Sequence, residues 1–188
     1  MIEQELIKRF RPILERHNEQ LEFLGEFGIA GGCIRDYLHN KPIKDIDLFV
    51  IVPINDLDTL YQEIDNSTLD VTLHKTVFYS SSGFLAEGSL YDSEEKLPIN
   101  IVFYSNVDSI KNLANSFDLV CNTGSITLED VRVPPETNYV QVNNITRLRR
   151  NRIDHLQEKY PEWDFKDVYK QLALIEEVEG FDIEKNIT

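Results

Sequence analysis

The order of apolar and polar residues along the chain predicts helices that alternate with strands. Apolar residues in the first twenty positions recur at helical spacing, and the segment LEFLGEFGIAGG then indicates a short strand that ends at Gly31. Residues 33–39 fit one or two helical turns. The run from Asp45 to Val52 is typical of a buried strand, which Pro53 ends.

The remainder of the chain continues this mixed pattern. Residues 55–64 fit a helix capped by Asn55, and several strands in succession favour a mixed sheet with packed helices, an α/β (α+β) fold, over a regular βαβ series. We expect a head domain over residues 1–144 and a C-terminal helical extension over 145–188, packed on the head. The further expected elements are strands at 69–79, 84–91 and 97–104, a helix near 108–116, a short SFDLVCNTGSI element, a Pro-Pro loop at 134–135, and helices at about 145–159 and 164–178.

Composition and charge restrict the kind of partner. The chain has 188 residues, of which 41% are hydrophobic and 28% charged, and no apolar run is long enough to cross a bilayer. The net charge of −14 disfavours an extended surface for duplex nucleic acid. The N-terminus lacks the pattern of a secretory signal, and the two cysteines, Cys33 and Cys121, are too few for a disulfide framework or a zinc site. We therefore expect a soluble, cytoplasmic protein without a cysteine nucleophile.

Two aspartates spaced Asp-x-Asp mark the strand that starts near residue 45. Strand geometry sends Asp45 and Asp47 to one face while Ile46 and Leu48 point into the core. Two carboxylates this close stay ionised together when a cation lies beside them, and hard oxygen ligands suit Mg²⁺. The pair predicts a site for Mg²⁺ or Mn²⁺ that is completed by substrate phosphates.

A glycine pair just upstream supplies the other half of this chemistry. Without Cβ atoms, the backbone N–H groups of Gly31 and Gly32 can approach a triphosphate closely, and a helix that begins there adds the positive end of its dipole. Arg35, one turn further on, is placed to pair with a phosphate, and we expect Asp36 to brace Arg35 or the loop. These residues indicate phosphoryl or nucleotidyl transfer.

The string Gly31-Gly32-x-Ile34-Arg35-Asp36-x-Leu38, followed by Lys44-Asp45-Ile46-Asp47, resembles the head-domain signature of the nucleotidyltransferase superfamily that includes DNA polymerase beta. It is most similar to the branch of bacterial-type tRNA CCA-adding enzymes and poly(A) polymerases. The resemblance implies a polymerase-beta-like nucleotidyltransferase fold, with a nucleoside triphosphate as substrate and Asp45 and Asp47 as catalytic metal ligands. Asn40 stands where that branch usually has Gly, a mild departure because Asn also tolerates a left-handed turn.

Two later stretches extend the resemblance. SFDLVCN is similar to a motif of the same branch that faces the bound nucleotide, which implies nucleotide-binding roles for Asp118 and Asn122, although the arginine pair of that motif is missing. Without that resemblance, Asp118 and Asn122 would be residues that cap or brace a turn. EKYPEWDF resembles a sequence near the end of small phage-encoded nucleotidyltransferase-like proteins.

The superfamily commonly supplies a third carboxylate from a neighbouring strand, and Asn100 occupies the aligned position in PINIVFY. An amide can coordinate a metal but cannot act as a base or bring negative charge. Either another aspartate such as Asp118 takes this role, or two carboxylates suffice, or the protein binds nucleotide and turns it over poorly. We favour the second of these.

The segment TRLRRNR gathers four arginines in seven positions. On a helix over 145–156, Arg149 and Arg152 fall in the apolar sector with Ile145, Leu148, Ile153 and Leu156, whereas Arg147 and Arg150 point away. An arginine on a packed face needs an anion, so Arg149 and Arg152 would reach either a carboxylate of the protein or the triphosphate. Arg147 and Arg150 would be solvated or contact a polynucleotide.

The function predicted from these residues is metal-dependent transfer of a nucleoside monophosphate to an acceptor hydroxyl. The acceptor is an RNA end, a protein side chain or a small molecule. The long helical tRNA-binding body of CCA-adding enzymes has no counterpart in this sequence, which argues against complete CCA synthesis. Two other hypotheses remain: a nucleotide-binding pseudoenzyme, and a phage interaction or counter-defence protein that uses its acidic surface as a decoy.

Overall fold

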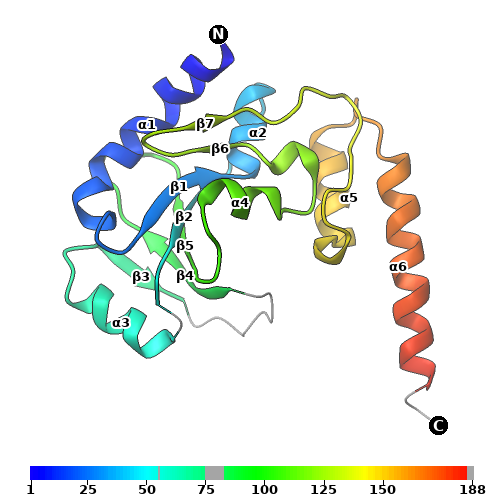
Figure 1. Ribbon diagram of the computed structural model, residues 1–188. Coiled ribbons are helices and arrows are strands. Elements are labelled where there is room, and N and C mark those ends of the chain that lie inside the picture. Colours follow the sequence, from blue (N-terminus) through cyan, green and yellow to red (C-terminus); the bar gives the residue numbers. More distant parts are fainter. Residues whose placement is uncertain (55, 75–82, 186–188) are drawn as a thin grey trace.

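The computed structural model describes residues 1–54, 56–74 and 83–185 (Figure 1). In the N-terminal half its elements are α1 (Ile2–Leu21), β1 (Glu26–Ala30), α2 (Gly32–Leu38), β2 (Ile46–Ile51), α3 (Leu57–Asp65), β3 (Val71–Leu73) and β4 (Phe84–Leu90). In the C-terminal half they are β5 (Ile99–Tyr104), α4 (Ile110–Asn115), η1 (Val120–Asn122), β6 (Ser125–Ile126), β7 (Val131–Arg132), η2 (Ile145–Arg147), α5 (Arg150–Lys159) and α6 (Lys166–Lys185).

One mixed sheet organises these elements. Its seven strands lie in the order β3-β4-β5-β2-β1-β6-β7, with β2 and β5 parallel and the other neighbouring pairs antiparallel. The two strands at the centre thus run side by side in one direction. The predicted mixed sheet with packed helices is confirmed.

The two faces of the sheet differ. On one face, apolar residues of β1, β2 and β5 pack with α1, α2 and α3, and Ile46 and Leu48 are fully buried there as expected. On the other face a smaller cluster joins Phe49 and Tyr104 to α4. Side chains alternate along a strand, so Asp47 and Phe49 share this second, less covered face. The candidate carboxylate of Asp47 therefore lies partly buried on the less covered face of the sheet.

A third apolar cluster ties the last helices to the rest of the chain. It joins residues of α5 and α6 to Leu119, Cys121 and Val140, and it contains the stacked rings of Tyr160 and Trp163, whose centroids lie 4.1 Å apart. Figure 1 shows α5 and α6 beside each other at one side of the sheet, past α2 and α4. The boundary between head and extension at residue 144 stays a prediction.

Several predicted bounds change in the structure. α3 begins after Asp56, whose side chain accepts a hydrogen bond from the Thr59 N–H at 2.8 Å. Asn55, the expected cap, lies outside the described residues, as do positions 75–79 of the expected strand at 69–79. The helix expected over 145–159 is wrong in its first part: Asn144 caps the short turn η2, Leu148 is extended, and α5 starts at Arg150.

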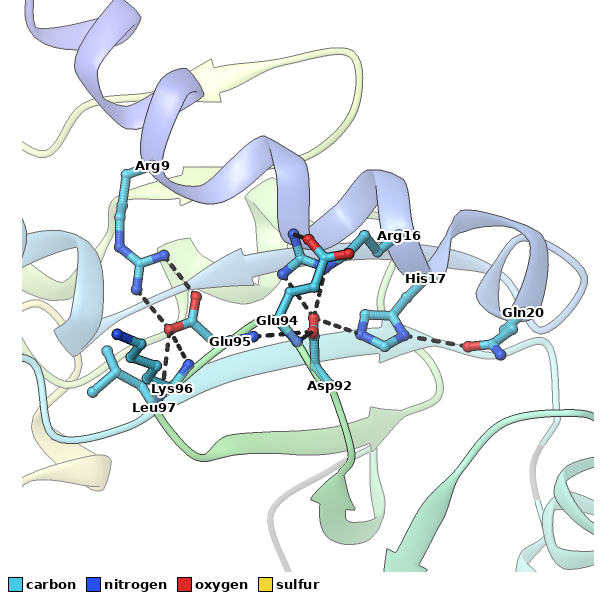
Figure 2. Close-up of polar contacts among 9 residues, drawn as sticks. All are labelled: Arg9, Arg16, His17, Gln20, Asp92, Glu94, Glu95, Lys96 and Leu97. Atoms are coloured by element: carbon cyan, nitrogen blue, oxygen red, sulfur yellow. Dashed lines mark hydrogen bonds and ion pairs between the residues drawn. The ribbon is translucent and has the colours of Figure 1, made fainter.

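An ion-pair cluster fastens α1 to the loop between β4 and β5 (Figure 2). Arg9 binds the carboxylate of Glu95 at 2.8 Å, and Arg16 donates to Asp92 at 2.8 and 3.0 Å. His17 lies 3.1 Å from the same Asp92 oxygen, and the backbone N–H groups of Glu94 and Glu95 bind its other oxygen. Burial alone would raise the pKa of Asp92, but these hydrogen bonds outweigh burial and lower the pKa to about 2.

We expect Asp92→Asn to remove part of the stability that the protein has at neutral pH. Because the folded pKa of Asp92 lies below the unfolded value, its contribution is complete above about pH 4 and is lost as pH falls towards 2. The wild type should therefore be more stable than the variant by about 2 kcal/mol at pH 7, with the gap closing in acid. Urea unfolding at several pH values measures this gap.

Glu94→Gln is the matched control for this experiment. Glu94 also faces Arg16, at 3.7 Å, but its side chain is 71% exposed, so its loss should change stability little at any pH. A pH-independent difference between Asp92→Asn and the wild type would contradict the proposed linkage.

Candidate active site

A cavity of about 230 Å³ lies where α2, the start of β2, η1 and α5 meet, and we call it the first cavity. Most residues that the sequence nominates line it. They are Gly32, Arg35, Asp45, Asp47, Asp118, Asn122 and Arg152. A smaller second cavity of about 190 Å³ adjoins it and shares Gly32, Asp47, Asp118, Asn122 and Arg152 with it. Residues from 31 to 152 are thus brought to one place.

The two aspartates differ in their surroundings. Asp47 lies within β2, pairs in register with Asn100 of β5, and accepts a hydrogen bond from the Asn100 amide at 3.1 Å. Burial raises the pKa of Asp47, and the Asn100 hydrogen bond counteracts part of that rise. Asp45 precedes β2, and its side chain is 36% exposed with Lys44 4.0 Å away. Asn100 therefore acts in this structure as a donor that orients Asp47.

The donor set fits a magnesium ion. Among residues 1–54, 56–74 and 83–185, no group of three or more His, Cys, Asp or Glu side chains is arranged to hold a metal. Asp45 and Asp47 offer two carboxylates in one cavity, and Mg²⁺ is usually held by one or two carboxylates together with water and substrate phosphates. The pair is suited to an ion that arrives with a nucleotide.

The glycine pair forms the turn between β1 and α2. Gly31 has φ +92°, a conformation that favours glycine, and a Cβ on Gly32 would lie 3.3 Å from the Arg35 guanidinium. The sequence predicted that the Gly31 N–H would bind a phosphate. In the structure this N–H instead donates to the Gly124 carbonyl at 3.1 Å. At the first position of α2, the N–H of Gly32 has no partner within the helix. Gly32 is therefore a backbone donor that this turn can offer.

A buried network fixes Arg35. Its Nε and one terminal nitrogen donate to Asp36 at 2.9 and 2.6 Å, and the other terminal nitrogen donates to Asn122 at 2.6 Å. Asp36 also accepts from the Tyr160 hydroxyl at 2.7 Å and from Lys159. The expected pairing of Asp36 with Arg35 is present, and the C-terminal partners Lys159 and Tyr160 were not identified from the sequence.

The network continues through η1. Asn122 donates to Asp118 at 2.9 Å, and the other oxygen of Asp118 lies 3.5 Å from Arg152. Asp118 is buried, whereas the Arg152 side chain is 63% exposed. Asp118 and Asn122 thus brace Arg35 and Arg152 at the cavity wall. The carboxylate of Asp118 is engaged by Asn122 and Arg152, and not by a residue of the Asp45–Asp47 pair.

The remaining arginines of TRLRRNR correct the helical interpretation. Arg149 lies outside both cavities and donates to the carbonyls of Thr146 and Leu148, at 3.2 and 2.7 Å. Ile145, expected on the packed face, is 46% exposed, because η2 is separated from α5. Arg147, expected to point away, lines the second cavity. A sequence analysis that assumes one unbroken helix turns Arg147 away from the site. The position of Arg147 at the second cavity follows only from the break at Leu148.

Aromatic side chains distinguish the second cavity from the first. Phe49, Tyr104 and Phe117 line it together with Arg147, and the ring of Phe49 lies 5.5 Å from that of Phe117. Burial raises the pKa of Tyr104, with Arg147 counteracting. Hence Tyr104 keeps its proton at neutral pH, and the three aromatic rings and Arg147 share the cavity wall with Asp47 and Asp118.

Burial determines the protonation of the two cysteines. Both are buried, and burial raises the pKa of Cys33 to about 12 and that of Cys121 to about 11. Thiols with such values are protonated at neutral pH. In the described part of the chain, helices long and apolar enough to span a bilayer are absent.

Comparison with known proteins defines the class. The chain is 30% identical over 110 residues to a CCA-adding enzyme of Staphylococcus saprophyticus, which is 54% of this chain and 25% of that enzyme. The apo form II structure of a CCA-adding enzyme aligns with a TM-score of 0.57 at 16% identity, over 94% of this chain and 47% of that one. A CCA-adding enzyme in complex with ATP aligns over 78% of this chain and 37% of its own, with a TM-score of 0.48 and 18% identity.

The chain therefore has the nucleotidyltransferase fold of CCA-adding enzyme heads, as the sequence motif predicted. It spans a quarter of the curated relative and less than half of the aligned structures. A family model described as "Gabija anti-defense 2 family protein" (Gad2) matches residues 1–159. The chain thus belongs to the Gad2 family.

Proposed function

We propose that this Gad2-family chain transfers a nucleoside monophosphate from a nucleoside triphosphate to an acceptor hydroxyl and releases pyrophosphate. The observation that supports it is one cavity lined by Asp45, Asp47, Gly32 and Arg35. This combination of two carboxylates, a glycine and a fixed guanidinium suits a metal-bound triphosphate. The reaction would take place in the cytoplasm of a phage-infected bacterium and serve the anti-defence role that the family name describes.

In this proposal the side chains have distinct tasks. Asp45 and Asp47 would hold Mg²⁺ or Mn²⁺, which neutralises charge on the phosphates when bound. Arg35 and the Gly32 N–H bind the triphosphate, and Asp36, Asn122 and Tyr160 keep the guanidinium in place. Arg152, which is more exposed, adds a cation from α5.

The transfer step forms one bond and breaks another. The acceptor oxygen attacks the α-phosphorus, the bond from phosphorus to the pyrophosphate oxygen breaks, and the hydroxyl proton passes to Asp47. Asn100 aligns the same carboxylate through its hydrogen bond.

Radioactive transfer tests the proposal. We expect label from one or more α-labelled nucleoside triphosphates to enter an acceptor, with Mg²⁺ or Mn²⁺ present, when the full-length protein is incubated with total RNA, total protein or small molecules of a bacterial lysate. The double variant Asp45→Ala, Asp47→Ala should abolish this transfer. Asp58→Ala, Asp65→Ala is the matched control, since both aspartates lie exposed on α3.

Binding without transfer would support the pseudoenzyme instead. Asn100 is the observation that keeps this second function open, because an amide replaces the carboxylate expected there. Measurable nucleotide binding with no pyrophosphate release in any fraction would overturn the transferase. An anti-defence effect that survives the double variant would instead favour the decoy.

A further inference from the structure

The two adjacent cavities divide the chemistry between them. The first contains the cationic side chains of Arg35, Lys44 and Lys159 together with Asp36 and Asp45, and the second contains three aromatic rings and Arg147. Asp47, Asp118 and Arg152 line both. A cavity rich in cations suits a triphosphate, whereas aromatic rings with one arginine suit a planar group that carries less charge.

The geometry of phosphoryl transfer places the acceptor in the second cavity. The attacking and leaving oxygens lie roughly in line on opposite sides of the phosphorus. If the triphosphate extends from Asp47 towards Arg35 and Lys159, the attacking hydroxyl comes from the other side of Asp47. Phe49, Tyr104 and Phe117 lie on that side, in the second cavity.

The lining of the second cavity selects among acceptors. Aromatic faces stack on nucleobases, and a guanidinium at the edge binds a phosphate. Asp47 and Asp118 line the same space as Arg147 and Arg152, and Asp118 is already paired with Arg152 at 3.5 Å. The lining therefore favours an acceptor with a ring and an anionic group.

The charges outside the cavities oppose a polynucleotide. Binding along a strand needs a series of cations that contact successive phosphates, and the whole chain has a net charge of −14. The arginine-rich segment does not form such a series: Arg150 is paired with Glu176 at 2.6 Å, and Arg149 donates to backbone carbonyls. Arg147 and Arg152 remain, and both border the second cavity.

We infer that the second cavity binds a free nucleotide whose ribose hydroxyl is the acceptor, so that the protein joins two nucleotides into a dinucleotide. This inference rests on the proposed nucleotidyl transfer and names its acceptor. The ribose oxygen of the acceptor bonds to the α-phosphorus of the donor, pyrophosphate leaves, and the hydroxyl proton goes to Asp47. Nothing is oxidised or reduced.

The test uses purified full-length protein with Mg²⁺ and no lysate. α-Labelled ATP is the donor, and AMP, GMP, CMP or UMP is the acceptor, because a monophosphate cannot itself act as a donor. We expect a labelled dinucleotide and an equal amount of pyrophosphate. A 5′-phosphorylated ten-residue oligoribonucleotide is offered in parallel and should be extended at least about tenfold more slowly, for lack of further phosphate contacts.

Two arginine variants locate the acceptor. Arg147→Ala should raise the KM for the monophosphate about tenfold through loss of one charge-assisted hydrogen bond, and should leave the binding of a non-hydrolysable ATP analogue within twofold. Arg150→Ala is the matched control, because Arg150 lies on the surface with Glu176, and should change neither value. Weaker binding of the ATP analogue in Arg147→Ala would overturn the assignment of the second cavity.

The remaining outcomes separate this inference from the proposed function. Label that enters lysate RNA or protein, with none in dinucleotides, would overturn the free-nucleotide acceptor and leave nucleotidyl transfer standing. Preferential extension of the oligoribonucleotide would do the same. Absence of pyrophosphate release with every acceptor would overturn both.

Discussion

Asp47→Asn should abolish nucleotidyl transfer and raise the melting temperature of the metal-free protein. The substitution keeps the shape of the side chain and an oxygen that can accept the hydrogen bond from Asn100. It removes a negative charge that burial disfavours, as the raised pKa of Asp47 shows. In EDTA we expect a rise of about 2–4 °C, the change that roughly 1 kcal/mol produces in a chain of this size.

The loss of activity should be at least about a hundredfold. A carboxylate that holds the metal and takes the proton acts on charge that develops in the transition state, where such groups contribute several kcal/mol. Each 1.36 kcal/mol is a factor of about ten in rate. Pyrophosphate release measured on the same preparation as the melting temperature gives both quantities.

Asp45→Asn separates the two effects. Asp45 lines the same cavity, but its side chain is 36% exposed, so water already stabilises its charge. We expect the same loss of transfer and a melting temperature close to that of the wild type. A drop in melting temperature for Asp47→Asn, or full activity in either variant, would contradict the roles assigned to these carboxylates.

Local sequence patterns predicted what local geometry determines. The run of apolar residues around Asp47 predicted a buried strand, and β2 is present there. The glycine pair predicted a tight turn, and Gly31 has the positive φ that favours glycine. Contacts between side chains of the same or adjacent elements could thus be predicted from the sequence. For this reason the pairing of Arg35 with Asp36, its neighbour in the sequence, was also foreseen.

Contacts between distant elements could not be predicted in the same way. Tyr160 reaches Asp36 across 124 positions, and no periodicity links the residue that follows α5 to one in the second half of α2. The predicted directions of the arginine side chains were wrong for a related reason. Leu148 is buried but has an extended backbone, and this separates η2 from α5. Arg147 then lies at the second cavity, whereas an unbroken helix would have turned it away.

Asp36→Ala should cause a large loss of stability. Asp36 is buried, and one carboxylate there binds Arg35, Lys159 and the Tyr160 hydroxyl. Removal of the anion leaves two cations without their partner in a poorly solvated place. Breaking a buried ion pair in this way typically costs about 3–5 kcal/mol, which is a large part of the stability of a domain.

Trp163 is a reporter for this loss. It is the single tryptophan of the chain, and its ring stacks on Tyr160 at 4.1 Å, so its fluorescence follows the packing of the residues that bind Asp36. Urea unfolding measured by this fluorescence should show the midpoint of Asp36→Ala well below that of the wild type. Far-UV circular dichroism, measured in parallel, shows whether the rest of the fold unfolds in the same transition.

Asp154→Ala is the matched control, because Asp154 also accepts a hydrogen bond from a tyrosine hydroxyl, that of Tyr169 at 2.7 Å, but lies exposed on α5. Its removal should move the midpoint by a small fraction of the Asp36 effect, since water solvates the groups that are left. Equal shifts in the two variants would mean that the tyrosine hydrogen bond, rather than the buried charge, sets the cost. An unchanged midpoint in Asp36→Ala would show that α5 is held to the head by the apolar cluster around Tyr160 and Leu119 alone.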